Sequence, residues 1–206
     1  MKIVIAIVVL MASCSSLPQS RATKTIPVSS PKPLELNIPK DPWEPLFFKA
    51  IDESAALSGL RSLRSYRLAD GDFEIRVWHG FGVTALRGFV LTRVNGQWSA
   101  VLLRAIPRNG ASNESQPLRE PKSGWEASLR RLEQAGLFTL PDAIAIHCLA
   151  GVNDGAGYVV EFNRDGVYRT YMYENPDYAR CNEAKRMIQI GDIISEEFGV
   201  PAMATK

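Results

Sequence analysis

The chain has 206 residues, of which 46% are hydrophobic and 22% charged, so it has enough apolar side chains to bury a core and is not a disordered protein. Lysine and arginine number 24 against 22 acidic residues, and this near balance gives no electrostatic argument for nucleic-acid binding. Two histidines and three cysteines leave little material for a metal site, so we expect no metal and no cofactor.

The chain begins with the pattern of an export signal. Met1-Lys2 forms a short basic segment, and nine apolar residues follow it from Ile3 to Met11. Nine residues are far fewer than the ~20 that a membrane-spanning helix needs. The run therefore fits the apolar region of a signal peptide, and the small residues Ala12 and Ser13 fit a cleavage site.

The segment Met11-Ala12-Ser13-Cys14 resembles the lipobox of bacterial lipoprotein precursors, in which an aliphatic residue and two small residues precede a cysteine. The resemblance implies that residues 1–13 are removed and that Cys14 becomes a lipidated N-terminus, so that the membrane is a partner through this anchor. The residue after the cysteine is Ser15 and not an aspartate. In the lipoproteins that the segment resembles, this implies sorting to the outer membrane, facing the periplasm. The alternative is an ordinary signal peptide cleaved after Ser13 or nearby.

Proline dominates the next segment. Seven of the thirteen prolines fall between residues 15 and 45, with serine, threonine and lysine between them. Proline removes backbone donors and favours extended chain, so we expect residues 14–42 to be a tether without a packed element. Residues 43–206 are then expected to form a single domain.

The first half of that domain carries clear local patterns. Apolar residues at helical spacing predict a helix over 43–58, and strict alternation predicts a strand over 73–79. Two apolar runs within 86–106 flank Asn95-Gly96, the preferred pair for a two-residue type I′ turn, and predict a hairpin. The proline-containing, polar residues 107–122 are expected to be a loop.

A second helix is expected to begin at Ser123 and end at Gly136. Ser123 and Glu126 have the spacing of a capping box, in which each side chain accepts a hydrogen bond from the other residue's amide. A glycine after the last apolar residue is the usual helix terminator. The short apolar run 143–149 is predicted to be a strand.

In the last third of the chain, the sequence predicts a second hairpin and a final helix. Residues 157–162 and 167–173 flank Asp165-Gly166, again a turn pair. Asn175-Pro176 suggests the start of a helix, which Gly191 would weaken or split and which Gly199 would end. The fold class is therefore α+β: a mainly antiparallel sheet of two hairpin units with two or three packed helices.

Two cysteines remain in the domain, Cys148 and Cys181. Export places them in an oxidising compartment, where a bridge closing a loop of roughly 33 residues would add about 3 to 4 kcal/mol of stability. The rival interpretation is a reactive Cys148 thiol beside His147. Neighbouring residues on a strand point to opposite faces, which argues against that dyad.

Four residues are candidates for binding, and each has a simpler interpretation. His79, at a strand end before glycine, could act as an acid or base beside Glu74 or Glu161, but fits a partly exposed turn better. Arg76, among several arginines, could bind an anionic ligand, although such arginines are usually solvated and paired with nearby acids.

Tyr171 and Tyr173 share one strand face and could form an exposed patch, although packing in the core is the more common reason for such a pair. The chain has no Gly-x-Ser-x-Gly, His-Glu-x-x-His or Walker motif, so no catalytic residue is assigned.

The C-terminal half, with its tryptophan-anchored helix, Leu140-Pro141-Asp142 turn and strand from Tyr168 to Tyr171, resembles uncharacterised proteobacterial envelope proteins. That resemblance implies no known activity. The sequence favours a lipid-anchored cell-envelope protein with a non-catalytic binding or assembly domain, whose partner is an envelope protein or an anionic ligand. The alternatives are a periplasmic enzyme of unrecognised type and a structural subunit of an envelope complex.

Overall fold

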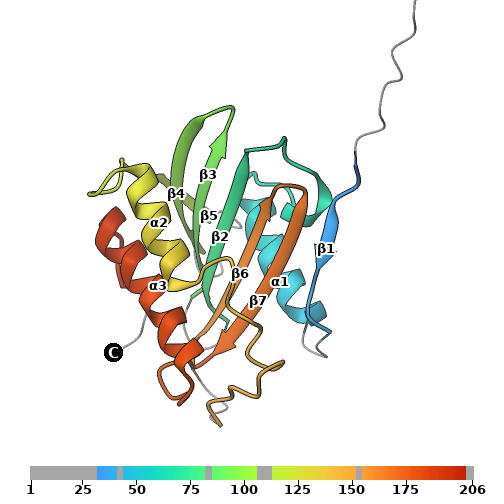
Figure 1. Ribbon diagram of the computed structural model, residues 1–206, viewed down its shortest axis with the longest axis vertical. Coiled ribbons are helices and arrows are strands. Elements are labelled where there is room, and N and C mark those ends of the chain that lie inside the picture. Colours follow the sequence, from blue (N-terminus) through green and yellow to red (C-terminus); the bar gives the residue numbers. More distant parts are fainter. Residues whose placement is uncertain (1–31, 41–43, 82–84, 106–112, 152–154, 203–206) are drawn as a thin grey trace, which may run out of the picture. The chain divides into compact units, whose positions relative to one another are not determined.

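A seven-stranded sheet with helices on both faces forms an α+β fold (Figure 1). The structure, a computed structural model, describes residues 32–40, 44–81, 85–105, 113–151 and 155–202. The strands are β1 (Glu35–Asn37), β2 (Phe73–Gly80), β3 (Arg87–Val94), β4 (Gln97–Ala105), β5 (Asn113–Pro117), β6 (Gly157–Arg164) and β7 (Val167–Glu174). The helices are α1 (Glu44–Leu57), the short 3-10 helix η1 (Leu63–Ser65), α2 (Trp125–Ala135) and α3 (Asn182–Phe198).

The sheet has the order β1-β7-β6-β2-β3-β4-β5, and β2 is its central strand. Every neighbouring pair is antiparallel except β1 and β7, which run parallel. Both hairpins that the sequence predicted, β3–β4 and β6–β7, are present, and they lie on the two sides of β2. The predicted fold class is therefore confirmed, with three α-helices in the described part of the chain.

The turn residues explain why these hairpins form. Asn95 and Gly96 have φ values of 52° and 74°, and Asp165 and Gly166 have 52° and 77°. Positive φ at both central positions is the requirement of a type I′ turn, whose twist matches that of the flanking strands. Both turns were predicted from sequence, and both are confirmed.

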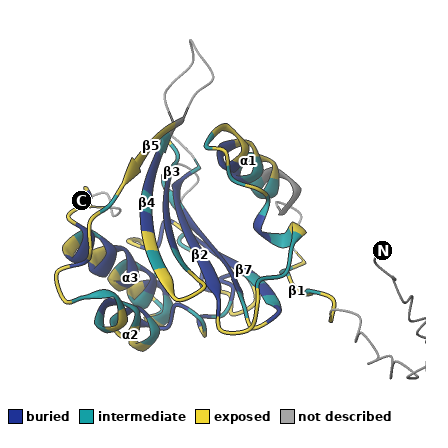
Figure 2. Cartoon of the chain, turned by 90° about the horizontal axis from the view of Figure 1, so that it is seen from above, coloured by how far each residue is buried: buried dark blue, intermediate teal, exposed yellow. Residues whose placement is uncertain are grey.

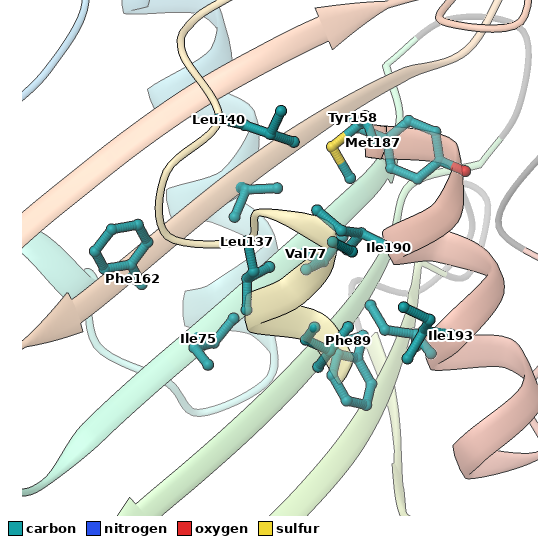
Figure 3. Packing of buried hydrophobic residues seen from close by; sticks show 14 of the residues in the cluster. Ile75, Val77, Phe89, Leu137, Leu140, Tyr158, Phe162, Met187, Ile190 and Ile193 are labelled. Carbon is teal, nitrogen blue, oxygen red and sulfur yellow. The ribbon is translucent and has the colours of Figure 1, made fainter. Parts of the chain in front are cut away.

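Alternation along β2 divides the molecule into three layers. Figure 2 shows α2 and α3 on one face of the sheet and α1 on the other. Phe73, Ile75 and Val77 point to the α2 and α3 face, whereas Arg76 and Trp78 point to the α1 face. The larger core lies under α2 and α3. Figure 3 shows strand side chains meeting residues of α3 and of the segment after α2, among them Ile75, Val77, Phe89, Leu137, Leu140, Met187, Ile190 and Ile193.

The predicted capping box is wrong. Helix α2 begins at Trp125 after Gly124, and no side chain caps it. The Ser123 amide instead donates to the Glu197 carboxylate of α3 at 2.9 Å. A buried carboxylate from the neighbouring helix has thus replaced the local partner, because burial makes an unpaired carboxylate costly.

The predicted strand at 143–149 is also wrong, because these residues form turns. The Ala143 amide donates to the Met172 carbonyl at 3.2 Å, and the Cys148 amide folds back to the Ala143 carbonyl at 2.8 Å. The region predicted as loop, 107–122, contains β5, which pairs with Val101–Ala105 of β4. In both places a contact with a strand outside the segment decides the local structure.

The final helix starts later than predicted. Asn175 has φ 45° and precedes a turn, and α3 begins at Asn182 with the Cys181 sulfur accepting the Ala184 amide at 3.2 Å. Gly191 does not split the helix. A Cβ at Gly191 would lie 3.0 Å from the Tyr158 hydroxyl oxygen, so the glycine allows α3 to approach the sheet.

The predicted tether contributes a strand. Glu35–Asn37 form β1, which pairs with Val167–Arg169 of β7, so the expectation of no packed element in 14–42 is wrong for these three residues. The predicted signal peptide, Cys14 and the first part of the tether lie outside the described residues. Within the described residues, no helix is both long and apolar enough to cross a membrane.

A prediction follows from the close approach of Gly88 and Trp78. A Cβ at Gly88 would lie 2.7 Å from Cζ3 of Trp78, whose side chain is fully buried. We expect Gly88→Ala to lower the free energy of unfolding by about 1–3 kcal/mol, measured by urea denaturation. In the control Gly157→Ala the nearest atom is 3.5 Å away, and the change should be much smaller; equal effects would contradict the packing argument.

Candidate functional site

Arg76, a predicted binding residue, lies inside the protein. Its side chain is 1% exposed and is 2.7 Å from the Glu74 carboxylate and 3.9 Å from that of Glu161. The Trp78 indole N–H donates to the other Glu161 oxygen at 2.9 Å. These residues lie on the α1 face of the sheet, and their interactions are with one another.

The segment before β2 completes this cluster. The Arg76 guanidinium donates to the Arg61 carbonyl at 2.8 Å, and the Tyr66 hydroxyl donates to Glu74 at 2.9 Å. Burial, with the nearby Glu74 carboxylate, raises the pKa of Tyr66 to about 12. Arg76 is therefore paired with nearby acids, as the simpler interpretation expected, but it is buried and not solvated.

Glu161 is the member of this cluster with the most altered titration. Burial raises the pKa of its carboxyl to about 7, against the opposing effects of the Arg76 guanidinium and the Trp78 indole N–H. A buried carboxylate facing a single shared cation is poorly solvated, which favours the protonated form.

His79 lies on the opposite face of the sheet from Glu74 and Glu161. It is 5% exposed in β2, and its ring centroid is 4.6 Å from that of Tyr158. Burial and the positive charge of Arg87 lower the pKa of His79 to about 4. The expectation of a partly exposed turn is wrong, and the alternation of β2 keeps His79 away from both glutamates.

Tyr171 and Tyr173 share a face, as predicted, but they are core residues. Each is 1% exposed, and their hydroxyls donate at 2.8 Å to the carbonyls of Leu137 and Pro141 respectively. Burial raises the pKa of both hydroxyls well above the usual range. They fasten the segment after α2 to the sheet and do not form an exposed patch.

The Cys148–Cys181 bridge is present, with the two Cα atoms 5.9 Å apart. It joins the turn segment 143–149 to the start of α3, as the pairing argument predicted. His147, with φ 55°, is exposed beside it. Because the Cys148 sulfur is bonded to Cys181, it cannot serve as the nucleophile of the rival interpretation.

An accessible site lies at the β7 edge of the sheet. A cavity of about 410 Å³, here called the β7-edge hollow, lies between β7, the chain just after β1, and the turn segment after α2. The size is within the range of small-molecule sites. Its lining residues are Asn37, Pro39, Pro141, Asp142, Ala145, Arg169 and Thr170.

Arg169 supplies the positive charge of the hollow. Its guanidinium donates to the Phe138 carbonyl at 2.6 Å and to the Leu140 carbonyl, and it lies 5.4 Å from the centre of the Tyr171 ring. Among the described residues, no carboxylate forms an ion pair with it. Arg169 is thus a half-buried cation that neutral carbonyl groups hold in place.

Asp142 also lines the hollow. One of its oxygens accepts the Ile144 amide and the other accepts the Met172 amide, both at 3.0 Å. The carboxylate thereby takes the place that a neighbouring strand's carbonyl would have along β7. Its charge is partly offset by the two amide dipoles, and the turn segment is held against the sheet.

A narrow apolar slot continues from the hollow beneath α1. It shares Pro39, Asp142 and Thr170 with the hollow, and its volume is about 30 Å³. That volume is enough for a group of about the size of one or two water molecules. The remaining walls are Phe47, Phe48, Val159, Tyr171 and Met172.

Sequence reasoning missed the hollow because its walls come from three distant segments. Arg169 shares a strand face with Tyr171 and Tyr173, and in the sequence this spacing of two residues signals only a strand. In the described part of the chain, histidine, cysteine and acidic side chains do not gather in groups of three or more that could hold a metal ion.

Comparison with known proteins does not assign the chain to a family. No family model matches the chain, and no curated protein matches it either.

The first prediction from this site concerns Glu161. Its folded-state pKa of about 7 lies above its ordinary value of 4.5, so its contribution to stability falls as pH rises from 4.5 to 7. Glu161→Gln keeps an acceptor for Trp78 and removes the titration. We expect its free energy of unfolding, relative to wild type, to rise from pH 4.5 to 7 by up to a few kcal/mol in urea titrations. Exposed Glu120→Gln should show no such trend.

The second prediction concerns His79, whose contribution to stability changes with pH in the opposite direction to that of Glu161. A folded-state pKa of about 4 against 6.5 means that stability is lost as pH falls from 6.5 to 4. His79→Phe keeps a ring beside Tyr158 and removes that loss, so its stability relative to wild type should rise on acidification, measured in the same way. His147→Asn changes the exposed histidine instead, and a matching rise in that variant would contradict the assignment.

Proposed function

We propose that this chain is a lipid-anchored cell-envelope protein whose folded domain binds a ligand or partner without catalysing a reaction. The observation that carries the location is Met11-Ala12-Ser13-Cys14 directly after a short apolar signal. Several acyl chains on one cysteine hold firmly where one would not, since each buried CH₂ contributes about 0.8 kcal/mol. Ser15 favours the outer membrane, facing the periplasm.

The bridge between Cys148 and Cys181 supports an oxidising compartment, although only weakly. It also fits the exported chain that the signal implies. With Cys14 as the lipid attachment site, all three cysteines have a role in an envelope protein.

Binding is favoured over catalysis by the positions of the candidate groups. His79 and the glutamates Glu74 and Glu161 lie on opposite faces of the sheet, so the acid–base pair considered from sequence does not form. The β7-edge hollow offers a charged and an apolar wall to a ligand. We place the binding function in this hollow.

A structural subunit is less well supported. Assembly through a helix would favour an apolar strip along its exposed face. Among the described residues, the large exposed hydrophobic side chains are scattered over separate segments: Leu36, Leu57, Val94, Ile146, Leu149 and Tyr178.

The test of the anchor is Cys14→Ser in the full chain. Wild-type protein should sediment with membranes and carry an acylated Cys14 by mass spectrometry of the mature N-terminus, whereas the variant should lack the lipid and leave the membrane fraction. Cys148→Ser with Cys181→Ser, the matched control, should retain the lipid. An unmodified wild-type N-terminus beyond Cys14 would overturn the proposal.

A further inference from the structure

We propose that the β7-edge hollow binds a carboxylate attached to a short apolar group, with Arg169 as the partner of the carboxylate. This inference rests on the proposed binding function and names the chemical class of the ligand. The same chemistry occurs in a small carboxylic acid and in the C-terminal residue of a peptide.

Arg169 has donors left for a ligand. A guanidinium carries five N–H groups, and two of them are used by the carbonyls of Phe138 and Leu140. These two contacts hold the side chain in one position, so little conformational entropy remains to be lost on binding. A planar guanidinium matches a carboxylate in geometry and charge.

The charge balance favours a ligand with a single negative charge. The Arg169 guanidinium can offset one negative charge. The Asp142 carboxylate, which also lines the hollow, is partly offset by the amides of Ile144 and Met172, and it repels a second negative charge. A phosphate dianion would bring a second charge to a cavity lined partly by proline and alanine, where desolvation is costly. Among anions, a monocarboxylate therefore fits best.

The rest of the hollow suits the apolar part of such a ligand. Pro39, Pro141 and Ala145 line it, and the slot beneath α1 continues from it with Phe47 and Met172 among its walls. With a volume of about 30 Å³, the slot accepts the end of a short chain and not a ring. Each methylene placed there should tighten binding about fourfold.

The experiment uses the full-length chain in detergent micelles, labelled with ¹⁵N, and hexanoate as the probe. We expect hexanoate to shift the backbone amide signals of Ala145 and Thr170 with a Kd of about 1 mM, as suits a ligand of few atoms. Hexanamide, which has the same shape and no charge, should bind about tenfold more weakly or not at all. Equal binding of the two would overturn the proposal.

Two variants test the assigned residue. Arg169→Gln should weaken hexanoate binding at least about tenfold, because it removes the charge-assisted hydrogen bonds. Since Arg169 also holds the segment after α2, Ala145→Trp serves as a second variant: it fills the hollow from an exposed position and should abolish binding. The control Arg164→Gln removes the same charge from the next strand, where Arg164 pairs with Glu133, and should bind as wild type does.

The outcomes are separable. Retained binding in both Arg169→Gln and Ala145→Trp, absence of any shift in the wild-type chain, or tighter binding of inorganic phosphate than of hexanoate overturns the inference. An acetylated dipeptide with a free C-terminus, compared with its amide, tells a peptide source from a small acid. Mass analysis of Cys14 is independent of these titrations, so a failure of the anchor and a failure of the ligand are told apart.

Discussion

The positive charge of Arg76 in the middle of the central strand constrains the whole α1 side of the sheet. A guanidinium that is 1% exposed must be neutralised within the protein, and Glu74 and Glu161 supply the two carboxylates. Glu161 can do so only if β6 pairs with β2 in the observed register, with Arg76 opposite Glu161. Removal of one partner would leave an uncompensated buried charge, at a cost of about 3–5 kcal/mol.

The same strand separates two kinds of interior. Its odd-numbered residues join the large apolar core under α2 and α3, and its even-numbered residues form the charged cluster under α1. With both faces covered, the predicted binding residues Arg76, His79 and the two tyrosines serve the fold. The accessible hollow lies instead at the β7 edge of the sheet.

At the β7 edge, two short elements bind the backbone of β7 in place of a full neighbouring strand. β1 pairs with the first residues of β7, and the Asp142 carboxylate takes up the Met172 amide further along. The hollow lies between these two pieces, and its wall is held by the Cys148–Cys181 bridge and by the carbonyl contacts of Arg169. The hollow is thus formed by the same segments that cover the β7 edge of the sheet.

The local sequence determined both hairpins, because Asn95-Gly96 and Asp165-Gly166 favour positive φ and the flanking residues alternate. It also determined the α+β class and the pairing of the two domain cysteines. Only the tertiary structure decided the edges and the helix starts: β1 and the Glu197 contact with Ser123 each depend on a partner far along the chain, and β5 depends on pairing with β4. The β7-edge hollow belongs to this second group, since Asn37, Asp142 and Arg169 meet only when the sheet has formed.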